Sequence, residues 1–93
     1  MIKNKKLLIA GNWKMNGFKK NLSVISLLIK YIKLKKLKSS EILICPPNTL
    51  IDSFSNLAKR SKLLIGAQNC SENETGAFTG EVSPSMLKDS GAQ

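Results

Sequence analysis

The 93-residue sequence contains no histidine, so the commonest metal ligand and the commonest catalytic acid or base are both missing from it. Its two cysteines, Cys45 and Cys70, are far apart and form no Cys-x-x-Cys pair. A metal centre usually needs closely spaced cysteine or histidine ligands. We therefore predict no metal site. We interpret Cys45 and Cys70 as reduced thiols of a cytoplasmic protein rather than as a disulfide.

The sequence also has no apolar run that approaches the length of about 20 residues that a membrane-spanning helix needs. Lysines near the N-terminus precede an apolar stretch, as in a secretory signal peptide, but that stretch is only Leu7–Ala10. A signal peptide needs an apolar segment of about 7–15 residues. The sequence therefore predicts neither a signal peptide nor a membrane partner, and it favours a cytoplasmic location.

Acidic residues are scarce, and the first of them, Glu41, follows eleven lysines in a chain of net charge +9. Such a balance is typical of surfaces that bind nucleic acid or anionic lipid, and also of a lysine-rich solvated face. Nucleic-acid modules usually add arginine and exposed aromatic side chains. Because Arg60 is the single arginine and aromatics make up 5% of the chain, we favour the solvated face. The alternative is a small basic α/β module that binds nucleic acid or anionic surfaces.

Short apolar runs alternate with helical patterns along the chain. Leu7–Ala10 is typical of a strand buried on both faces, and Ile42–Cys45 and Leu63–Ala67 predict two further strands. An amphipathic helix between the first two strands is predicted from apolar residues that are spaced alternately by four and three. These residues are Phe18, Leu22, Ile25, Ile29 and Ile32. A second helix is predicted from Leu50, Phe54, Leu57 and Ala58.

The segment Gln68–Gly80 is polar and longer than the usual connection of about 2–6 residues, so we expect a functional loop there. Ser83 and Pro84 predict the start of a third helix, and Gly91 predicts its end. Strands that alternate with helices in this way imply a parallel sheet. Because a sheet of only three such strands leaves two hydrophobic edges unpaired, we expect the chain to continue beyond Gln93.

The stretch Ala10–Gly17 places an amide, an indole and an ammonium just past the predicted end of the first strand. In parallel α/β folds, active sites are built at the carboxyl edge of the sheet. Asn12 and Lys14 are therefore the first candidates for functional side chains.

The segment Gly11–Asn16 closely resembles the motif that opens triosephosphate isomerases. Five further segments resemble later motifs of that family's sequence, in the same order. These segments are Cys45-Pro46-Pro47, Ile65–Asn69, Glu74–Glu81, Ser83–Asp89 and Gly91-Ala92. The resemblance covers the whole chain and corresponds to the first three of eight βα units. It implies a TIM (β/α)8 barrel, an α/β fold, of which residues 1–93 form the N-terminal part of a single domain and no complete domain.

The resemblance also implies an activity, the interconversion of dihydroxyacetone phosphate and glyceraldehyde 3-phosphate in glycolysis and gluconeogenesis. This aldose–ketose isomerisation proceeds through an enediolate intermediate and needs neither a metal nor an organic cofactor. The implied partners are the triose phosphate substrate and a second copy of the chain in a cytoplasmic homodimer, with no nucleic acid and no membrane.

Roles of single residues follow from the same resemblance at matching positions. It implies that Lys14 is the catalytic ammonium and that Asn12 binds substrate and orders Lys14. A lysine between a tryptophan and a methionine at a strand end also suggests a partly desolvated charge, which acts in a lower dielectric than water. Trp13 is expected to pack rather than react, and Asn16 and Gly17 to shape the turn into the first helix.

Met15, Thr75 and Gly76 are implied to lie in the interface between two copies, with Thr75 at the tip of the long loop. The family's histidine electrophile and glutamate base would follow Gln93 in the sequence. A positioned acid or base contributes about 10²–10⁴-fold to an enzymatic rate. We therefore expect residues 1–93 alone to be inactive.

Overall fold

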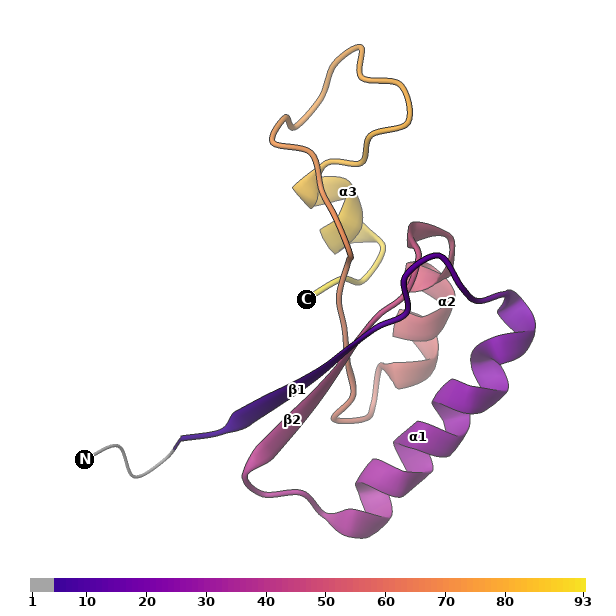
Figure 1. Cartoon of the computed structure of the whole chain (residues 1–93), viewed down its shortest axis with the longest axis vertical. Coiled ribbons are helices and arrows are strands. Elements are labelled where there is room, and N and C mark those ends of the chain that lie inside the picture. The colour runs from indigo at the N-terminus through magenta and orange to yellow at the C-terminus, as the bar shows by residue number, and fades with distance from the viewer. Residues whose placement is uncertain (1–4) are drawn as a thin grey trace.

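The computed structural model describes residues 5–93, which form a three-stranded parallel sheet and its connecting helices (Figure 1). The elements in chain order are β1 (Leu7–Asn12), the 3₁₀ turn η1 (Lys19–Asn21), α1 (Leu22–Lys35), β2 (Ser40–Cys45), α2 (Asn48–Ala58), β3 (Leu64–Ile65) and α3 (Pro84–Asp89). Lys3, one of the N-terminal lysines in the signal-peptide comparison, lies outside the described residues.

The strand β2 lies in the middle of the sheet, between β1 and β3, and all three run in the same direction. β1 and β2 pair along their whole length, from Leu7 opposite Ser40 to Asn12 opposite Cys45. The order of elements and the parallel sheet are as the sequence predicts. Because the strands are parallel, the carboxyl ends of β1 and β2 meet at one edge.

The strand β3 is shorter than the predicted strand Leu63–Ala67 and contains two residues. Toward β2, the N–H of Gly66 donates to the carbonyl of Ile44 at 2.9 Å. On the opposite side, the carbonyl of Ile65 accepts from the backbone N–H of Gln93 at 2.9 Å. The N–H of Ile65 donates to Oε1 of Gln93 at 3.1 Å, so Gln93 occupies the outer side of β3.

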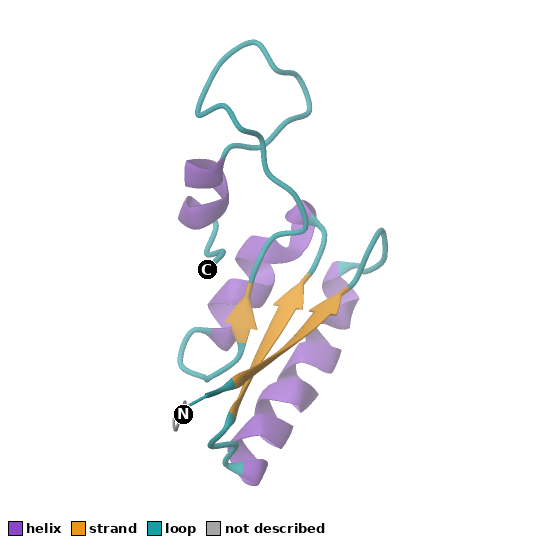
Figure 2. Cartoon of the chain, turned by 60° about the vertical axis from the view of Figure 1, so that its left-hand side comes forward, coloured by secondary structure: helices purple, strands orange, loops and turns teal. Residues whose placement is uncertain are grey.

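The helices α1 and α2 lie side by side on one face of the sheet, whereas α3 lies beyond them near the C-terminus (Figure 2). The core fills the space between these helices and the sheet. Its largest fully buried side chains are Phe54, Ile25, Leu50, Ile51, Ile65 and Pro46. The buried residues of α1 and α2 recur at the helical spacing of the sequence pattern, because each helix turns one stripe toward the sheet.

The expectation that Leu7–Ala10 is buried on both faces is wrong for the described residues. Leu7, Leu8 and Ile9 are 62%, 57% and 53% exposed. The reason is that α1 and α2 cover one face of the sheet, and β1 has β2 as its single strand neighbour among residues 5–93. An apolar run is compatible with two-sided burial, but burial itself depends on the elements that pack against the strand.

The helix α1 begins later than the pattern predicts, because η1 comes first. Asn21 Oδ1 accepts from the N–H of Phe18 at 2.8 Å, and Phe18 remains 70% exposed. The helix ends at Lys35, and the capping residue Lys36 has a left-handed φ of 48° and donates its N–H to the carbonyl of Ile32 at 3.1 Å. A left-handed C-terminal residue satisfies a helix carbonyl that has no partner within the helix.

The helix α3 begins where the sequence predicts. The side chain of Ser83 accepts from the N–H of Met86 at 3.1 Å, and Pro84 is the first helical residue. Because Ser83 is buried, its hydroxyl supplies to the N–H of Met86 the acceptor that water would supply at an exposed helix start. Gly91 follows the helix with a φ of 109°, which confirms the predicted stop.

We expect Gly91→Ala to lower the free energy of unfolding by about 2–4 kcal/mol. Gly91 has a left-handed backbone, and an added Cβ would also collide with the side chain of Ser55 on α2. Gly80→Ala is the matched control, because Gly80 has a φ of 87° but open space around its Cβ position. Its cost should be about 1 kcal/mol, from the backbone alone. Urea denaturation measures both, and equal costs would contradict the steric argument.

Three observations concern the disulfide, the metal site and the membrane-spanning segment that the sequence does not predict. Cys45 and Cys70 are free cysteines. Within residues 5–93, no group of three or more histidine, cysteine, aspartate or glutamate side chains could hold a metal ion. No helix in the described part of the chain is long and apolar enough to cross a membrane.

Candidate active site at the carboxyl edge of the sheet

The candidate site lies where the three strands end. Asn12 is the last residue of β1 and pairs with Cys45, the last residue of β2. Gln68 follows β3, and its side-chain nitrogen donates both to the carbonyl of Lys14 at 2.8 Å and to the carbonyl of Cys45 at 2.9 Å. One amide therefore links the end of β2 to the segments that follow β1 and β3, and it holds the backbone of Lys14 relative to the sheet.

The backbone of Lys14 adopts an uncommon conformation. Its φ is 58°, a left-handed value that costs a residue with a Cβ roughly 1–2 kcal/mol. Asn12 Oδ1 accepts from the N–H of Lys14 at 2.8 Å, and Asn16 Nδ2 donates to the carbonyl of Trp13 at 2.9 Å. These bonds hold the turn in a shape that the residues alone would disfavour. The expectation that Asn16 shapes the turn is confirmed, and Asn12 contacts the backbone of Lys14, whereas its role toward the ammonium stays a prediction.

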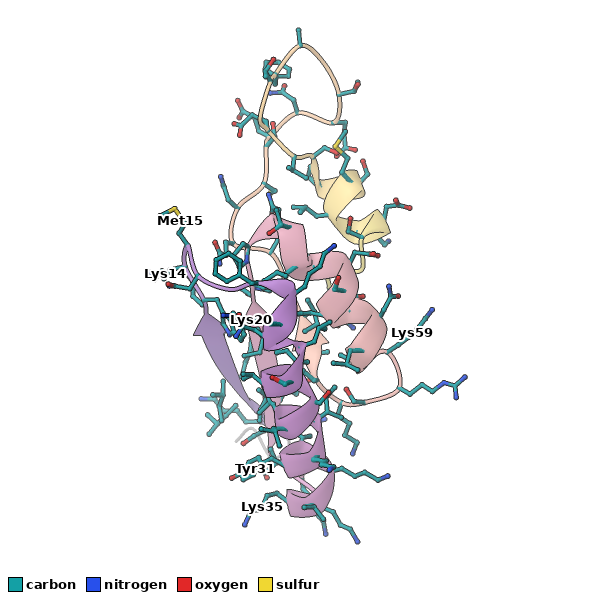
Figure 3. The ribbon with its side chains drawn as sticks, turned by 90° about the vertical axis from the view of Figure 1, so that its right-hand side faces the viewer. Lys14, Met15, Lys20, Tyr31, Lys35 and Lys59 are labelled. Carbon is teal, nitrogen blue, oxygen red and sulfur yellow. The ribbon has the colours of Figure 1, made fainter. Side chains whose placement is uncertain are left out.

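The side chain of Lys14 is exposed, so the expected partial desolvation is not found in the described residues. In Figure 3, Lys14 and Met15 lie together on the loop after β1, at the outside of the molecule. The flanking Trp13 does not cover the ammonium, because its ring turns inward instead. An exposed ammonium attracts anions, but water and salt weaken that attraction.

Trp13 has the packing role that the sequence predicts. Its ring meets that of Phe54 on α2 edge to face, with centroids 5.2 Å apart and an interplanar angle of 76°. Gly17 lies against the same ring, with a φ of 115°, and a Cβ there would come within 2.9 Å of Trp13 Cε3 and of Leu50 Cδ1. Glycine is needed at this turn for its conformation and for close approach, which confirms its expected role.

The long loop forms a projection of its own above α3 (Figure 1). Its base is closed by the N–H of Ser71, which donates to the carbonyl of Val82 at 2.8 Å. Thr75 and Gly76 belong to the segment between Ser71 and Val82 and are exposed, and Gly76 has a φ of 139°. Met15, on the loop after β1, is 96% exposed. The three predicted interface residues are therefore accessible, on two separate projections of the chain.

Sequence reasoning missed the role of Gln68. The available signal was an amide just past the third strand, in the segment Ile65–Asn69 that also takes part in the family resemblance. What the sequence could not supply is the proximity of Gln68 to Lys14, 54 residues earlier. That proximity follows from β2 lying between β1 and β3.

We expect Gln68→Met, which keeps the length of the side chain, to lower the free energy of unfolding by about 1–2 kcal/mol. It removes the donor that the carbonyls of Lys14 and Cys45 share. Asn69→Ala, at the neighbouring exposed amide, should change stability by less than about 0.5 kcal/mol. Urea denaturation followed by circular dichroism measures both. A Gln68→Met variant as stable as Asn69→Ala would show that these bonds contribute nothing.

The fold and the site together indicate the class of protein to which the chain belongs. Parallel strands joined by helices on one face of the sheet, with polar side chains at the carboxyl edge, are typical of (β/α)8-barrel enzymes. A crystal structure of triosephosphate isomerase from Bartonella henselae superimposes with a TM-score of 0.86 at 37% identity, and the match covers 94% of this chain and 35% of that one.

The sequence comparisons agree with the structural one. The family model described as "Triosephosphate isomerase" matches residues 7–93. Triosephosphate isomerase of Psychromonas ingrahamii is 43% identical over 88 residues, which are 92% of this chain and 34% of the relative. The enzyme of Rhizobium meliloti is 44% identical over 82 residues, 88% of this chain and 32% of the relative. The chain belongs to the triosephosphate isomerase family, and it spans about a third of the length of these curated relatives.

Proposed function

We propose that residues 1–93 form the N-terminal part of a single (β/α)8 barrel domain, and that the whole protein interconverts dihydroxyacetone phosphate and glyceraldehyde 3-phosphate. The observation that supports this best is the family match over residues 7–93, combined with Asn12 and Lys14 at the carboxyl edge of the sheet. The position of Gln93 beside β3 also supports it, because a fourth parallel strand of the barrel would pair there.

In this proposal Lys14 is the catalytic ammonium. Proton abstraction next to the carbonyl of a triose phosphate places negative charge on the carbonyl oxygen, and the substrate phosphate is already an anion. Lys14 supplies a positive charge to both, and because its backbone is already held in place, less reorganisation is needed when the charge develops. Asn12 and Gln68 fix the backbone of Lys14, so they contribute to that preorganisation.

The substrate-binding role of Asn12 is part of the same proposal. Its Oδ1 is engaged by the N–H of Lys14, which leaves its Nδ2 as a donor toward the substrate. The proposed reaction needs neither a metal nor an organic cofactor. The remaining electrophile and the carboxylate base belong to other parts of the whole domain, so residues 1–93 alone should not turn over triose phosphate.

We also propose that the whole protein is a cytoplasmic homodimer. Met15, Thr75 and Gly76 would lie in its interface, and their exposure is compatible with contact to a second copy. Methionine is enriched in the cores of protein–protein interfaces, which supports this role for the exposed Met15.

The test is an isomerase assay on the protein encoded by the complete reading frame and, in parallel, on residues 1–93 alone. The whole protein should convert dihydroxyacetone phosphate to glyceraldehyde 3-phosphate without added metal and in the presence of a chelator. Residues 1–93 should show no turnover above the uncatalysed rate. A whole protein without isomerase activity would overturn the proposed function, and turnover by residues 1–93 would overturn the assigned division of roles.

A further inference from the structure

A concave feature lies at the opposite edge of the sheet from Lys14. It is a groove of about 1000 Å³ between the end of α1, the end of α2 and the amino ends of β2 and β3. Figure 3 shows Lys35, near the end of α1, at the far end of that helix from Lys14 and Met15. The proposed isomerase site and this groove therefore do not share residues.

Six cations line the groove, against the single carboxylate of Glu41. They are Lys6, Lys33, Lys36, Lys38, Arg60 and Lys62. Cations near helix C-termini are ordinarily explained by their favourable interaction with the helix dipole. That explanation applies to Lys33 and Lys36 at the end of α1 and to Arg60 just after α2.

The helix dipole does not account for the other three cations, which are exposed. Lys6, Lys38 and Lys62 each come one or two residues before the first residue of β1, β2 or β3. Because the strands are parallel, these positions meet at one edge of the sheet, where the helices also end. Like charges gathered in this way repel one another, and a bound anion would relieve that repulsion.

The floor of the groove is apolar. It includes Ile29 of α1, Ile42 of β2 and Leu64 of β3, all half-buried, and Leu57 of α2, which is 41% exposed. An apolar floor below a cationic rim matches a ligand that has an apolar body and an anionic end. The volume lies at the upper limit of about 300–1000 Å³ for small-molecule sites.

Two other polyanions fit less well. Nucleic-acid bases would need aromatic side chains on which to stack, and the residues that line the groove are aliphatic, hydroxyl-bearing or charged. A lipid bilayer presents an extended surface, whereas these apolar side chains lie on the floor of a concavity. The combination of floor and rim favours a single small molecule.

We propose that this groove is a binding site for a monomeric amphiphilic anion, an alkyl chain that ends in a phosphate or carboxylate group. The alkyl chain lies on Ile42, Leu57 and Leu64, and the anionic end is held by the cations before the strands, chiefly Lys38 and Lys62. The ligand is taken up from solution rather than from a bilayer. This site is independent of the proposed isomerase function, since it lies at the other edge of the sheet.

The test uses the protein encoded by the complete reading frame and three probes below their micellar concentrations. These are octyl phosphate, octyl glucoside with the same chain and a neutral head, and inorganic phosphate. Calorimetry should show octyl phosphate binding at least about tenfold more tightly than either other probe. The reason is that octyl glucoside has no anionic end for the cationic rim, and inorganic phosphate has no alkyl chain for the apolar floor. Methyl resonances of Ile29, Ile42, Leu57 and Leu64 should shift in the unmodified protein.

Charge-reversal variants locate the site. Lys38→Glu together with Lys62→Glu should weaken octyl phosphate binding by at least about tenfold. Lys20→Glu together with Lys88→Glu makes the same change in net charge outside the groove and should alter the affinity by less than about twofold. Circular dichroism confirms that both double variants are folded, and the methyl shifts of the unmodified protein test the proposal without any variant.

Several outcomes would overturn the proposal. Equal affinity for octyl glucoside would mean that charge has no part in binding. Equal loss in both double variants would mean that only the net charge matters. Retention of single-stranded DNA or of anionic phosphatidylglycerol vesicles, lost only in Lys38→Glu/Lys62→Glu and without octyl phosphate binding, would assign the groove to a polyanion or a membrane instead.

Discussion

Lys14→Gly in the whole protein should lower kcat/KM for triose phosphate by at least about 10²–10³-fold, the scale of losing one group that stabilises a developing oxyanion. The same change should raise the free energy of unfolding by about 0.5–1 kcal/mol. Glycine relieves a left-handed φ of 58°, which costs roughly 1–2 kcal/mol, and part of that gain is offset by the greater freedom of glycine in the unfolded chain.

Two controls separate the charge of Lys14 from its backbone. Lys36→Gly relieves the other left-handed lysine, with a φ of 48°, and should raise stability by a similar amount. Lys19→Ala removes an exposed ammonium from the η1 turn and should leave kcat/KM within about twofold. Steady-state kinetics and urea denaturation measure these effects. If Lys14→Gly kept full activity, the proposed role of the ammonium would be wrong.

Phe54→Ala should lower the free energy of unfolding by about 3–5 kcal/mol, the largest stability effect that we expect from one substitution in this chain. Phe54 is 0% exposed, and its ring is also half of the edge-to-face pair with Trp13. Truncation leaves a cavity between α2 and the turn that holds Lys14. Typical domains are stable by only about 5–15 kcal/mol, so a large share of the stability should be lost.

Trp13 makes this prediction easy to observe, because it is the single tryptophan of the chain and its fluorescence reports on the contact with Phe54. Leu57→Ala is the control on the same helix, because Leu57 is 41% exposed and its truncation opens no enclosed cavity. Its cost should be about 1 kcal/mol. Urea denaturation followed by fluorescence compares the two, and equal costs would show that Phe54 is not central to the core.

The parts of the fold that the sequence predicts are those that local rules decide. Ser83 and Pro84 start α3, and Gly91 ends it, because capping and φ preferences act within a few residues. The alternation of strands and helices followed from apolar periodicity in the same way. The start of α1 was missed because Phe18 fits the helical spacing although Asn21 caps a separate 3₁₀ turn.

What the sequence could not predict depends on contacts between distant segments. The exposure of Leu8 on β1 depends on which elements cover the sheet, and an apolar run has the same composition in either case. The left-handed backbone of Lys14 is held by Asn12 and by Gln68, and the second of these is placed only by the order of the strands. The family resemblance implied the roles of Lys14 and Asn12, but it implied nothing about the support from Gln68.

The closure at the base of the long loop has a consequence for how the protein can vary. Because a backbone hydrogen bond joins Ser71 to Val82, the distance between β3 and α3 does not depend on the length of the loop between Ser71 and Val82. Residues can therefore be added or exchanged within the loop, for example next to Gly80, where there is open space, without changing where α3 begins. The loop is an exchangeable module, in which surface contacts can diversify while the scaffold stays constant.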